Sequence, residues 1–175
     1  MQTHHRKTLR AQRYDYTSPG AYFVTICTKD RVHYFGEIVN GKMVMNELGK
    51  ICIQEIIETQ QRRSHLRIDE YIVMPNHIHM MIIVRTYGNT SWIWSDNISN
   101  INIPMDALPR VPTESLGSIV RNIKSRVTKY ANQNNIPFAR QWRYHDHIIC
   151  NTGEYERIKY YIQTNPENRK KDCFS

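Results

Sequence analysis

The sequence predicts an α+β fold in which a β-sheet has its helices packed on one face. Three observations predict it. β-branched and aromatic residues gather in short runs, such as "AYFVTICT" at 21–28, that are typical of strands. Longer segments repeat apolar residues at helical spacing. Turn residues separate these segments, and a sheet with helices laid against it is the α+β arrangement.

The first half of the chain is predicted to form a strand, a hairpin and a helix. The strand covers 21–28, and "HYFGEIV" and "KMVMNEL" flank Asn40-Gly41, the strongest short hairpin signal. A helix is expected from about Asn46 to Arg63, because apolar residues recur on one face there. Those residues are Leu48, Ile51, Cys52 and Ile56.

Two further strands, "RIDEYIVM" and "HIHMMIIVR", are predicted to meet at the turn residues Pro75-Asn76. Residues 86–112 are polar and interrupted by prolines, which predicts a long loop or an insertion. Trp92 and Trp94 within it have two interpretations: a stacking platform for nucleic-acid bases, or an anchor that packs the loop onto the core.

The remaining elements are a helix, a strand and a helix. Thr113, Glu114 and Ser115 offer capping groups for a helix that ends near Asn134. "QWRYHDHIIC" then reads as a strand, and "TGEYERIKYYIQTN" as a helix ending before Pro166.

The length predicts one domain over 1–175, with residues 1–13 as a basic N-terminal arm. The sequence contains no run of 18 apolar residues, so no membrane span is predicted. The basic N-terminus is not followed by the apolar stretch of a secretory signal. The four cysteines include no C-x-x-C pair, which argues against a zinc ribbon and favours reduced thiols in a cytoplasm.

The net charge of +8, from 24 Lys and Arg against 16 Asp and Glu, favours a polyanionic partner. The excess is concentrated between Thr113 and Lys171, which hold eleven basic and five acidic residues. The alternative is an ordinary solvated basic surface.

Two histidines, His77 and His79, interrupt an apolar strand. Side chains alternate along a strand, so both point to one face, about 7 Å apart along it, where they could share a divalent ion. The alternative is that each is separately satisfied by a carbonyl or carboxylate. His145 and His147 have the same spacing, and spacing alone does not rank the two pairs.

Tyr161 and Asn165 lie four residues apart in the last predicted helix, and therefore on one face. Beside a two-histidine site they would supply a nucleophile and a third metal ligand. Tyr161 has a simpler interpretation as a half-buried aromatic. Tyr160 is its rival, although its partner one turn on, Thr164, is a poorer ligand than an amide oxygen.

Three stretches, in this order, resemble the single-tyrosine HUH transposases: "YIVMPNHIHMMIIV", the basic helix, and "WRYHDHIICNTGEYERIKYYIQTNPEN". Within that family the chain looks like the REP-associated tyrosine transposase branch, of the transposase IS200-like kind. The resemblance spans residues 14–170 and is strongest in "MPNHIH" and "YYIQTNP". The 86–112 loop and the short C-terminal tail depart from the family pattern.

The resemblance implies a ferredoxin-like (RRM-like) antiparallel sheet and a transesterase that cuts single-stranded DNA. Tyr161 would be the catalytic nucleophile, forming a 5′-phosphotyrosine intermediate. His77, His79 and Asn165 would bind the metal, Mg²⁺ or Mn²⁺, with Asn165 where relatives often have glutamine. His147 matches a position that is commonly histidine in this branch without being a ligand.

The implied partner is single-stranded DNA next to a hairpin, and no ATP is needed because the phosphotyrosine stores the phosphoester energy. The protein would work at the nucleoid as a monomer or a homodimer. The phosphate contacts are expected from Arg6, Lys7, Arg10, Arg13, Arg121, Lys124, Arg126 and Lys129. Two alternatives stay open: a non-cleaving or domesticated hairpin-binding protein, and a metal-dependent hydrolase in which Tyr161 is structural.

Overall fold

The computed structural model describes residues 15–16, 18–85 and 114–166. The predicted arm at 1–13 and the predicted loop at 86–112 lie outside these residues. The same holds for Arg6, Lys7, Arg10, Arg13, Trp92 and Trp94.

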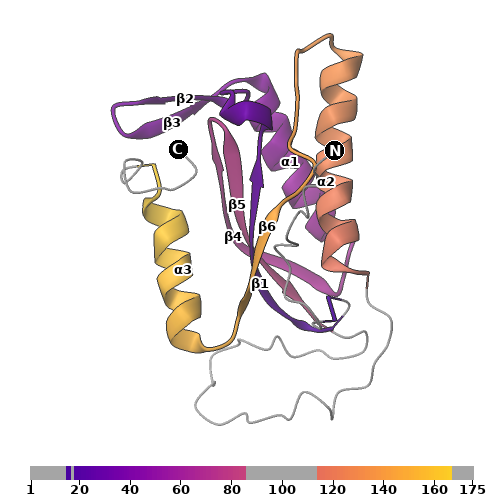
Figure 1. The fold of residues 1–175 in the computed structure, drawn as a ribbon, viewed down its shortest axis with the longest axis vertical. Helices are drawn as coiled ribbons and strands as arrows, with labels where there is room; N and C mark the ends of the chain where they lie inside the picture. Colours follow the sequence, from indigo (N-terminus) through magenta and orange to yellow (C-terminus); the bar gives the residue numbers. More distant parts are fainter. Residues whose placement is uncertain (1–14, 17, 86–113, 167–175) are drawn as a thin grey trace, which may run out of the picture.

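Four strands form one antiparallel sheet in the order β4-β5-β1-β6 (Figure 1). They are β1 (Gly20–Cys27), β4 (Leu66–Met74), β5 (His77–Val84) and β6 (His145–Ile149). Helix α1 (Glu47–Gln61) connects the hairpin after β1 to β4, and α2 (Leu116–Gln133) precedes β6. This succession of strand, helix, two strands, helix and strand confirms the α+β class and the ferredoxin-like topology.

A small hairpin is inserted between β1 and α1. It consists of β2 (Gly36–Val39) and β3 (Lys42–Met45), after the short 3-10 helix η1 (Lys29–Arg31). The two turn residues have positive φ, 51° at Asn40 and 75° at Gly41, the geometry of a tight two-residue hairpin turn. The predicted hairpin is therefore confirmed.

Helices α1 and α2 cover one face of the sheet and enclose the larger core. Asn46 and Ser115 cap them, each side-chain oxygen accepting a hydrogen bond from a backbone N–H in the first turn. The core between helices and sheet is aliphatic, with Ile56, Ile82 and Ile123 among its fully buried side chains.

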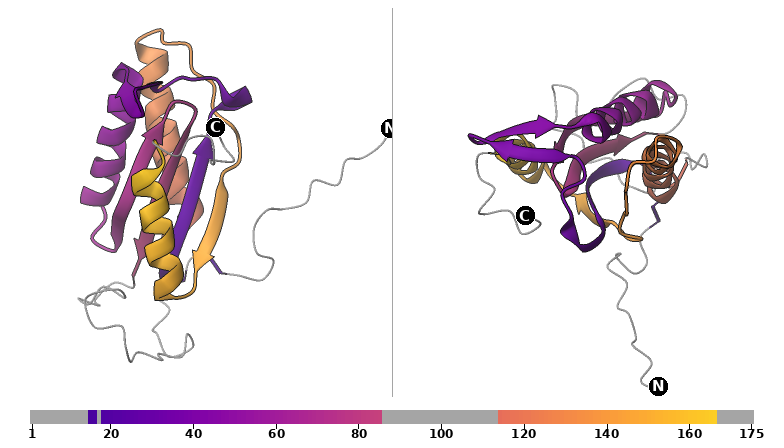
Figure 2. Two further views of the ribbon diagram at one scale, coloured as in Figure 1. Left: turned by 90° about the vertical axis from the view of Figure 1, so that its left-hand side faces the viewer. Right: turned by 90° about the horizontal axis from the view of Figure 1, so that it is seen from above.

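The third helix, α3 (Thr152–Thr164), lies on the opposite face of the sheet (Figures 1 and 2). Its apolar side packs on Met81 and Ile83 of β5 in a second, smaller core. The prediction that the helices pack on one face is therefore wrong for α3. β5 explains the difference, because all eight of its residues are buried and a strand buried on both faces needs a cover on each.

A β-bulge in β4 fastens α3 to the sheet. The register between β4 and β5 shifts between Ile68 and Glu70, and Asp69 occupies the break. Its carboxylate accepts hydrogen bonds from Tyr155 and Lys159 of α3. Burial acts to raise the pKa of Asp69, but these bonds and the nearby Arg67 outweigh it and hold the pKa below its usual value.

No helix in the described ranges has the length and apolar character to cross a membrane. Cys27 and Cys52 are buried thiols outside any disulfide, and burial raises the pKa of Cys52 to about 12.

Candidate active site on the α3 face of the sheet

The two histidines of β5 lie under α3 at one end of the sheet. The register pairs His77 with Cys27 and His79 with Thr25 on β1, the central neighbour. Both imidazoles are fully buried, with ring centroids 4.6 Å apart. The predicted placement of both rings on one face is confirmed, and that face is the one covered by α3.

Each ring is held by a hydrogen bond at Nδ1. His77 Nδ1 lies 2.7 Å from Oδ1 of Asn76, which can only accept, so Nδ1 carries the hydrogen and Nε2 presents a lone pair. His79 Nδ1 lies 2.8 Å from the hydroxyl of Thr25. A second-shell partner at one ring nitrogen is the usual way in which proteins orient a metal-binding histidine toward the metal.

Tyr161 reaches this pair from α3. Its hydroxyl lies 3.3 Å from Nε2 of His79, with the two ring centroids 5.3 Å apart. Phe23 packs against both rings, at 5.2 Å from His79 and edge-on at 6.1 Å from Tyr161. Tyr160, the rival candidate, points away from the sheet and is 68% exposed. The structure therefore brings Tyr161, and not Tyr160, to the histidines.

Asn165 ends α3 as its C-cap, one turn beyond Tyr161. The side chain is 1% exposed, and neither of its amide atoms has a hydrogen-bond partner among the described residues. Along α3 the contacts move from Tyr155 at Asp69 to Tyr161 at His79, so the next turn continues toward the His77 end of β5. A buried amide without a partner is costly, and a ligand at this end would satisfy it.

The donor set fits a divalent cation. No group of three His, Cys, Asp or Glu side chains in the described ranges is arranged to hold a metal, so a metal here would need the amide of Asn165 as its third ligand. Imidazole and amide donors suit Mn²⁺ better than Mg²⁺, which prefers oxygen. The buried, oriented rings and the unsatisfied amide together fit such an ion.

The second histidine pair has a different setting. His145 and His147 lie on the edge strand β6, opposite Thr25 and Phe23. His147 Nε2 lies 2.7 Å from the carboxylate of Glu154, whose pKa is lowered by the backbone N–H of Cys150 and by this contact. His147 therefore braces the start of α3 at an exposed edge.

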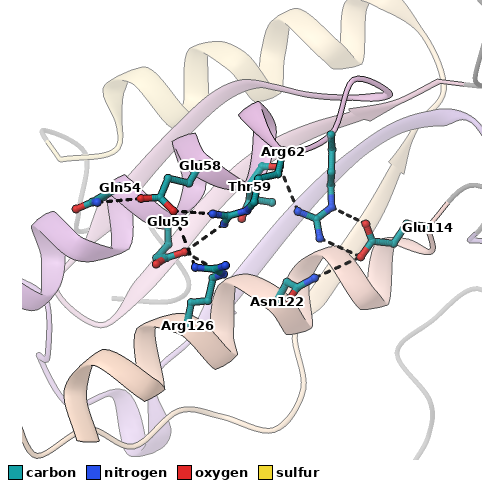
Figure 3. Close-up of polar contacts among 9 residues, drawn as sticks. Gln54, Glu55, Glu58, Thr59, Arg62, Glu114, Asn122 and Arg126 are labelled. Atoms are coloured by element: carbon teal, nitrogen blue, oxygen red, sulfur yellow. Dashed lines mark hydrogen bonds and ion pairs between the residues drawn. The ribbon is translucent and has the colours of Figure 1, made fainter. Parts of the chain in front are cut away.

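The basic helix α2 does not present its cations as one surface. Arg121 and Lys129 are exposed. Arg126 turns toward α1, 3.6 Å from Glu55 and 3.9 Å from Glu58 (Figure 3). Lys124 is only 6% exposed, and its ammonium donates to the backbone carbonyls of residues 141, 142 and 143. The predicted phosphate contact by Lys124 is thus replaced by a structural role.

A hollow of about 370 Å³, lined by His65 among others, lies in the layer of α1 and α2, away from His77 and His79. Its arginines are paired: Arg62 with Glu58 and Arg63 with Glu114. Figure 3 shows Arg62 and Arg126 meeting the same two glutamates of α1, while Asn122 reaches Glu114. The arrangement joins the two helices and is not the candidate site.

Several residues that shape the site were not expected from the sequence. Thr25 and Asn76 orient the histidines, Phe23 packs against His79 and Tyr161, and Asp69 fixes α3. The signal for Asn76 was present in "PNHIH", since its side chain is adjacent to the ring it binds. Thr25 and Asp69 depend on strand register and a bulge, which carry no local signal.

The fold is that of a solved transposase. The structure of a REP-associated tyrosine transposase bound to a REP hairpin superposes with a TM-score of 0.57 and 20% identity, covering 91% of this chain and 74% of that one. A candidate transposase from Deinococcus radiodurans gives 0.42 and 14% identity over 88% and 95% of the two chains, too low to establish a shared fold.

The sequence comparison is more direct. No family model matches the chain. An uncharacterised protein of Haemophilus influenzae is 37% identical over 171 residues, which span 93% of this chain and 89% of the relative. With that identity over nearly the full length of both chains, the protein belongs to the same family as the Haemophilus influenzae protein.

Proposed function

We propose that the protein is a transposase-type enzyme that cuts and rejoins single-stranded DNA beside a hairpin through a covalent bond to Tyr161. The observation that carries the proposal is the phenol oxygen of Tyr161, 3.3 Å from Nε2 of a buried histidine that Thr25 orients. A nucleophile beside an oriented metal-type histidine pair is the arrangement needed for metal-assisted phosphoryl transfer.

The reaction would proceed by one displacement at phosphorus. The Tyr161 oxygen forms a bond to the phosphorus as it loses its proton, and the bond from phosphorus to the 3′ oxygen breaks. The 3′ oxygen takes up a proton and leaves as a free hydroxyl, while the 5′ phosphate stays on the tyrosine. The reverse attack by a 3′ hydroxyl rejoins the strand without ATP.

A free tyrosine has a pKa of about 10, so the attacking phenol needs nearby positive charge at neutral pH. A divalent cation held by His77, His79 and Asn165 would supply that charge and polarise the phosphate. The chain itself holds the reacting group in place: Phe23 packs edge-on against Tyr161, and Asp69 anchors the helix that carries it.

The choice of substrate rests on the fold neighbour, which is bound to a REP hairpin. The exposed Arg121 and Lys129 and the basic N-terminal sequence would contact phosphates without reading the base sequence. Tyr161 and both histidines come from one chain, so a monomer can complete this site. An enzyme acting on chromosomal DNA in this way would work at the nucleoid.

The test is formation of a covalent adduct. The protein is incubated with labelled single-stranded DNA that carries a hairpin, with Mn²⁺ or Mg²⁺, and adducts are resolved on a denaturing gel. We expect a metal-dependent adduct with wild type and none with Tyr161→Phe. Tyr160→Phe is the matched control, because that ring is exposed and should leave adduct formation unchanged.

Two other results would favour a different function. Binding of the hairpin without an adduct under any metal would indicate a non-cleaving DNA-binding protein. Repeated turnover to a free 5′ phosphate, unaffected by Tyr161→Phe, would indicate a hydrolase in which Tyr161 is structural.

A further inference from the structure

Trp142 is the most exposed of the large apolar side chains in the described residues, at 90%. It lies in the segment that joins α2 to β6. The guanidinium of Arg140 sits 5.9 Å from the centre of its ring, and Arg143 beside it is also exposed. A bare indole among cations on the surface exposes apolar area that water does not favour, and it has the composition of a single-strand stacking site.

The backbone of this segment is held firmly, although the segment forms no helix or strand. Lys124 donates to three successive carbonyls, of Gln141, Trp142 and Arg143, at 2.7, 3.2 and 3.2 Å. Burying an ammonium is costly, and burial, with Arg140 adding to it, lowers the pKa of Lys124 to about 8. A buried lysine therefore fixes the backbone that carries Trp142.

The segment lies at the same end of the sheet as the histidines. Arg140 forms a bridge to Thr28, and the N–H of Gln141 donates to the carbonyl of Cys27. The N–H of Thr28 donates to the carbonyl of Asn76, the residue before His77. In Figure 1 the same segment descends beside α2 to β6, the edge strand. The backbone that carries Trp142 therefore lies at the histidine end of the sheet, next to the edge strand β6.

We propose that Trp142 stacks on a base of the single-stranded DNA that flanks the cleaved bond, on a segment that Lys124 holds in place. The inference rests on the proposed function for its substrate class. Arg140 and Arg143 match the phosphates of the same strand in charge, and the indole face accepts any base. Trp142 would then position the strand without taking part in the chemistry.

The test measures binding in the Tyr161→Phe background, so that no cleavage intervenes. The probe is a labelled oligonucleotide with a hairpin and single-stranded flanks. Base stacking on an aromatic residue is worth about 1–3 kcal/mol, so Trp142→Ala should weaken binding by roughly 5- to 150-fold. Trp142→Phe keeps an aromatic ring and should weaken binding less than Trp142→Ala does. Tyr160→Ala, which removes an exposed aromatic ring elsewhere, should change binding by less than about twofold.

Two further readouts separate stacking from a general loss of fold. In the same Tyr161→Phe background, replacing single flank nucleotides by abasic ones should weaken binding at one position when Trp142 is present, and should have no added effect when Trp142→Ala is also present. Lys124→Met should weaken binding, and the double variant should bind no more weakly than Trp142→Ala alone, because both changes remove the same contact.

The outcomes distinguish this inference from the proposed function. Equal binding by Tyr161→Phe with and without Trp142→Ala overturns the inference, even where the wild-type protein forms the Tyr161 adduct. Weakened binding with a single abasic-sensitive position supports it even where no adduct is found. Failure of the chain to bind any single-stranded probe overturns both.

Discussion

The hydroxyl of Thr25 lies 2.8 Å from Nδ1 of His79, and the two residues face each other across β1 and β5. Both are buried, so water does not compete for this hydrogen bond. The bond fixes the plane of the imidazole and directs Nε2 toward Tyr161. The orientation of the nucleophile and of the ring beside it thus depends on a threonine on a different strand.

Replacing this hydroxyl should impair the site without unfolding the protein. Thr25→Val keeps the shape but removes the partner of His79, and loss of such outer-shell partners typically costs about 10- to 100-fold in metal affinity or activity. We expect that loss in the rate of adduct formation and in Mn²⁺ affinity. Thr25→Ser keeps the hydroxyl and should recover most of the rate. Equal rates for the valine and serine variants would contradict the role given to Thr25.

The attachment of α3 through Asp69 should control both stability and activity. Asp69→Asn weakens the bonds from Tyr155 and Lys159, and hydrogen bonds to a charged group contribute about 1.5–3 kcal/mol. We expect a loss of that order in the free energy of urea unfolding, with slower adduct formation because α3 carries Tyr161. Glu70 of β4 accepts an exposed hydrogen bond from Gln163 of the same helix, and Glu70→Gln should lower the free energy of unfolding by less than about 0.5 kcal/mol.

The contribution of Asp69 should also depend on pH. Its folded pKa is lowered, so the carboxylate stabilises the folded state above the unfolded pKa of about 3.9. That stability is lost as the pH falls through the lower, folded value. The difference in unfolding free energy between wild type and Asp69→Asn should be constant from pH 5 upward and shrink below about pH 4. A difference unchanged down to pH 3 would exclude the ion-paired carboxylate.

The sequence predicted the elements well, because periodicity and turn chemistry are local signals. The hairpin at Asn40-Gly41, both long helices and the paired strands around Pro75-Asn76 are where the pattern placed them. The face chosen by α3 was missed, since an apolar stripe on a helix does not say which side of a sheet it covers. The continuous apolar run of β5 does carry that information, because a strand covered on one face alternates in polarity.

The grouping of the candidate site residues was predicted in part for the same reason. The motifs pointed to His77, His79 and Tyr161, which the structure brings together, and the contact between Tyr161 and His79 was expected only by resemblance; their functional roles stay predictions. Lys124 was misassigned, because a count of basic residues along a helix does not separate a solvated lysine from one turned inward. The partners of buried groups come from register and chain crossing, which no single stretch of sequence encodes.

Asn165 should show opposing effects on stability and function. Its buried amide has no hydrogen-bond partner among the described residues, which costs folding free energy unless a ligand is bound. In metal-free buffer, Asn165→Leu should therefore have a free energy of urea unfolding about 1 kcal/mol larger than that of wild type. Mn²⁺ should stabilise wild type by mass action and leave the leucine variant unchanged. The same variant should lose adduct formation.

Two results would contradict this account of Asn165. A leucine variant less stable than wild type without metal would show that the amide contributes a native contact. A leucine variant that retains both the Mn²⁺ stabilisation and the adduct would remove Asn165 from the site.

Lys124 provides the last prediction, because its pKa differs between the two states of the chain. It is about 8 in the folded protein, whereas lysine in the unfolded chain titrates near 10.4. Between these values the unfolded state binds more protons, so this group makes the folded state more stable as the pH rises. The unfolding free energy of wild type relative to Lys124→Met should therefore increase from pH 8 to pH 10. Lys129→Met, at an exposed position on the same helix, is the matched control. Urea titrations at pH 7.5, 8.5 and 9.5 measure both, and a flat difference for Lys124→Met would mean that its ammonium is solvated and does not hold the Trp142 segment.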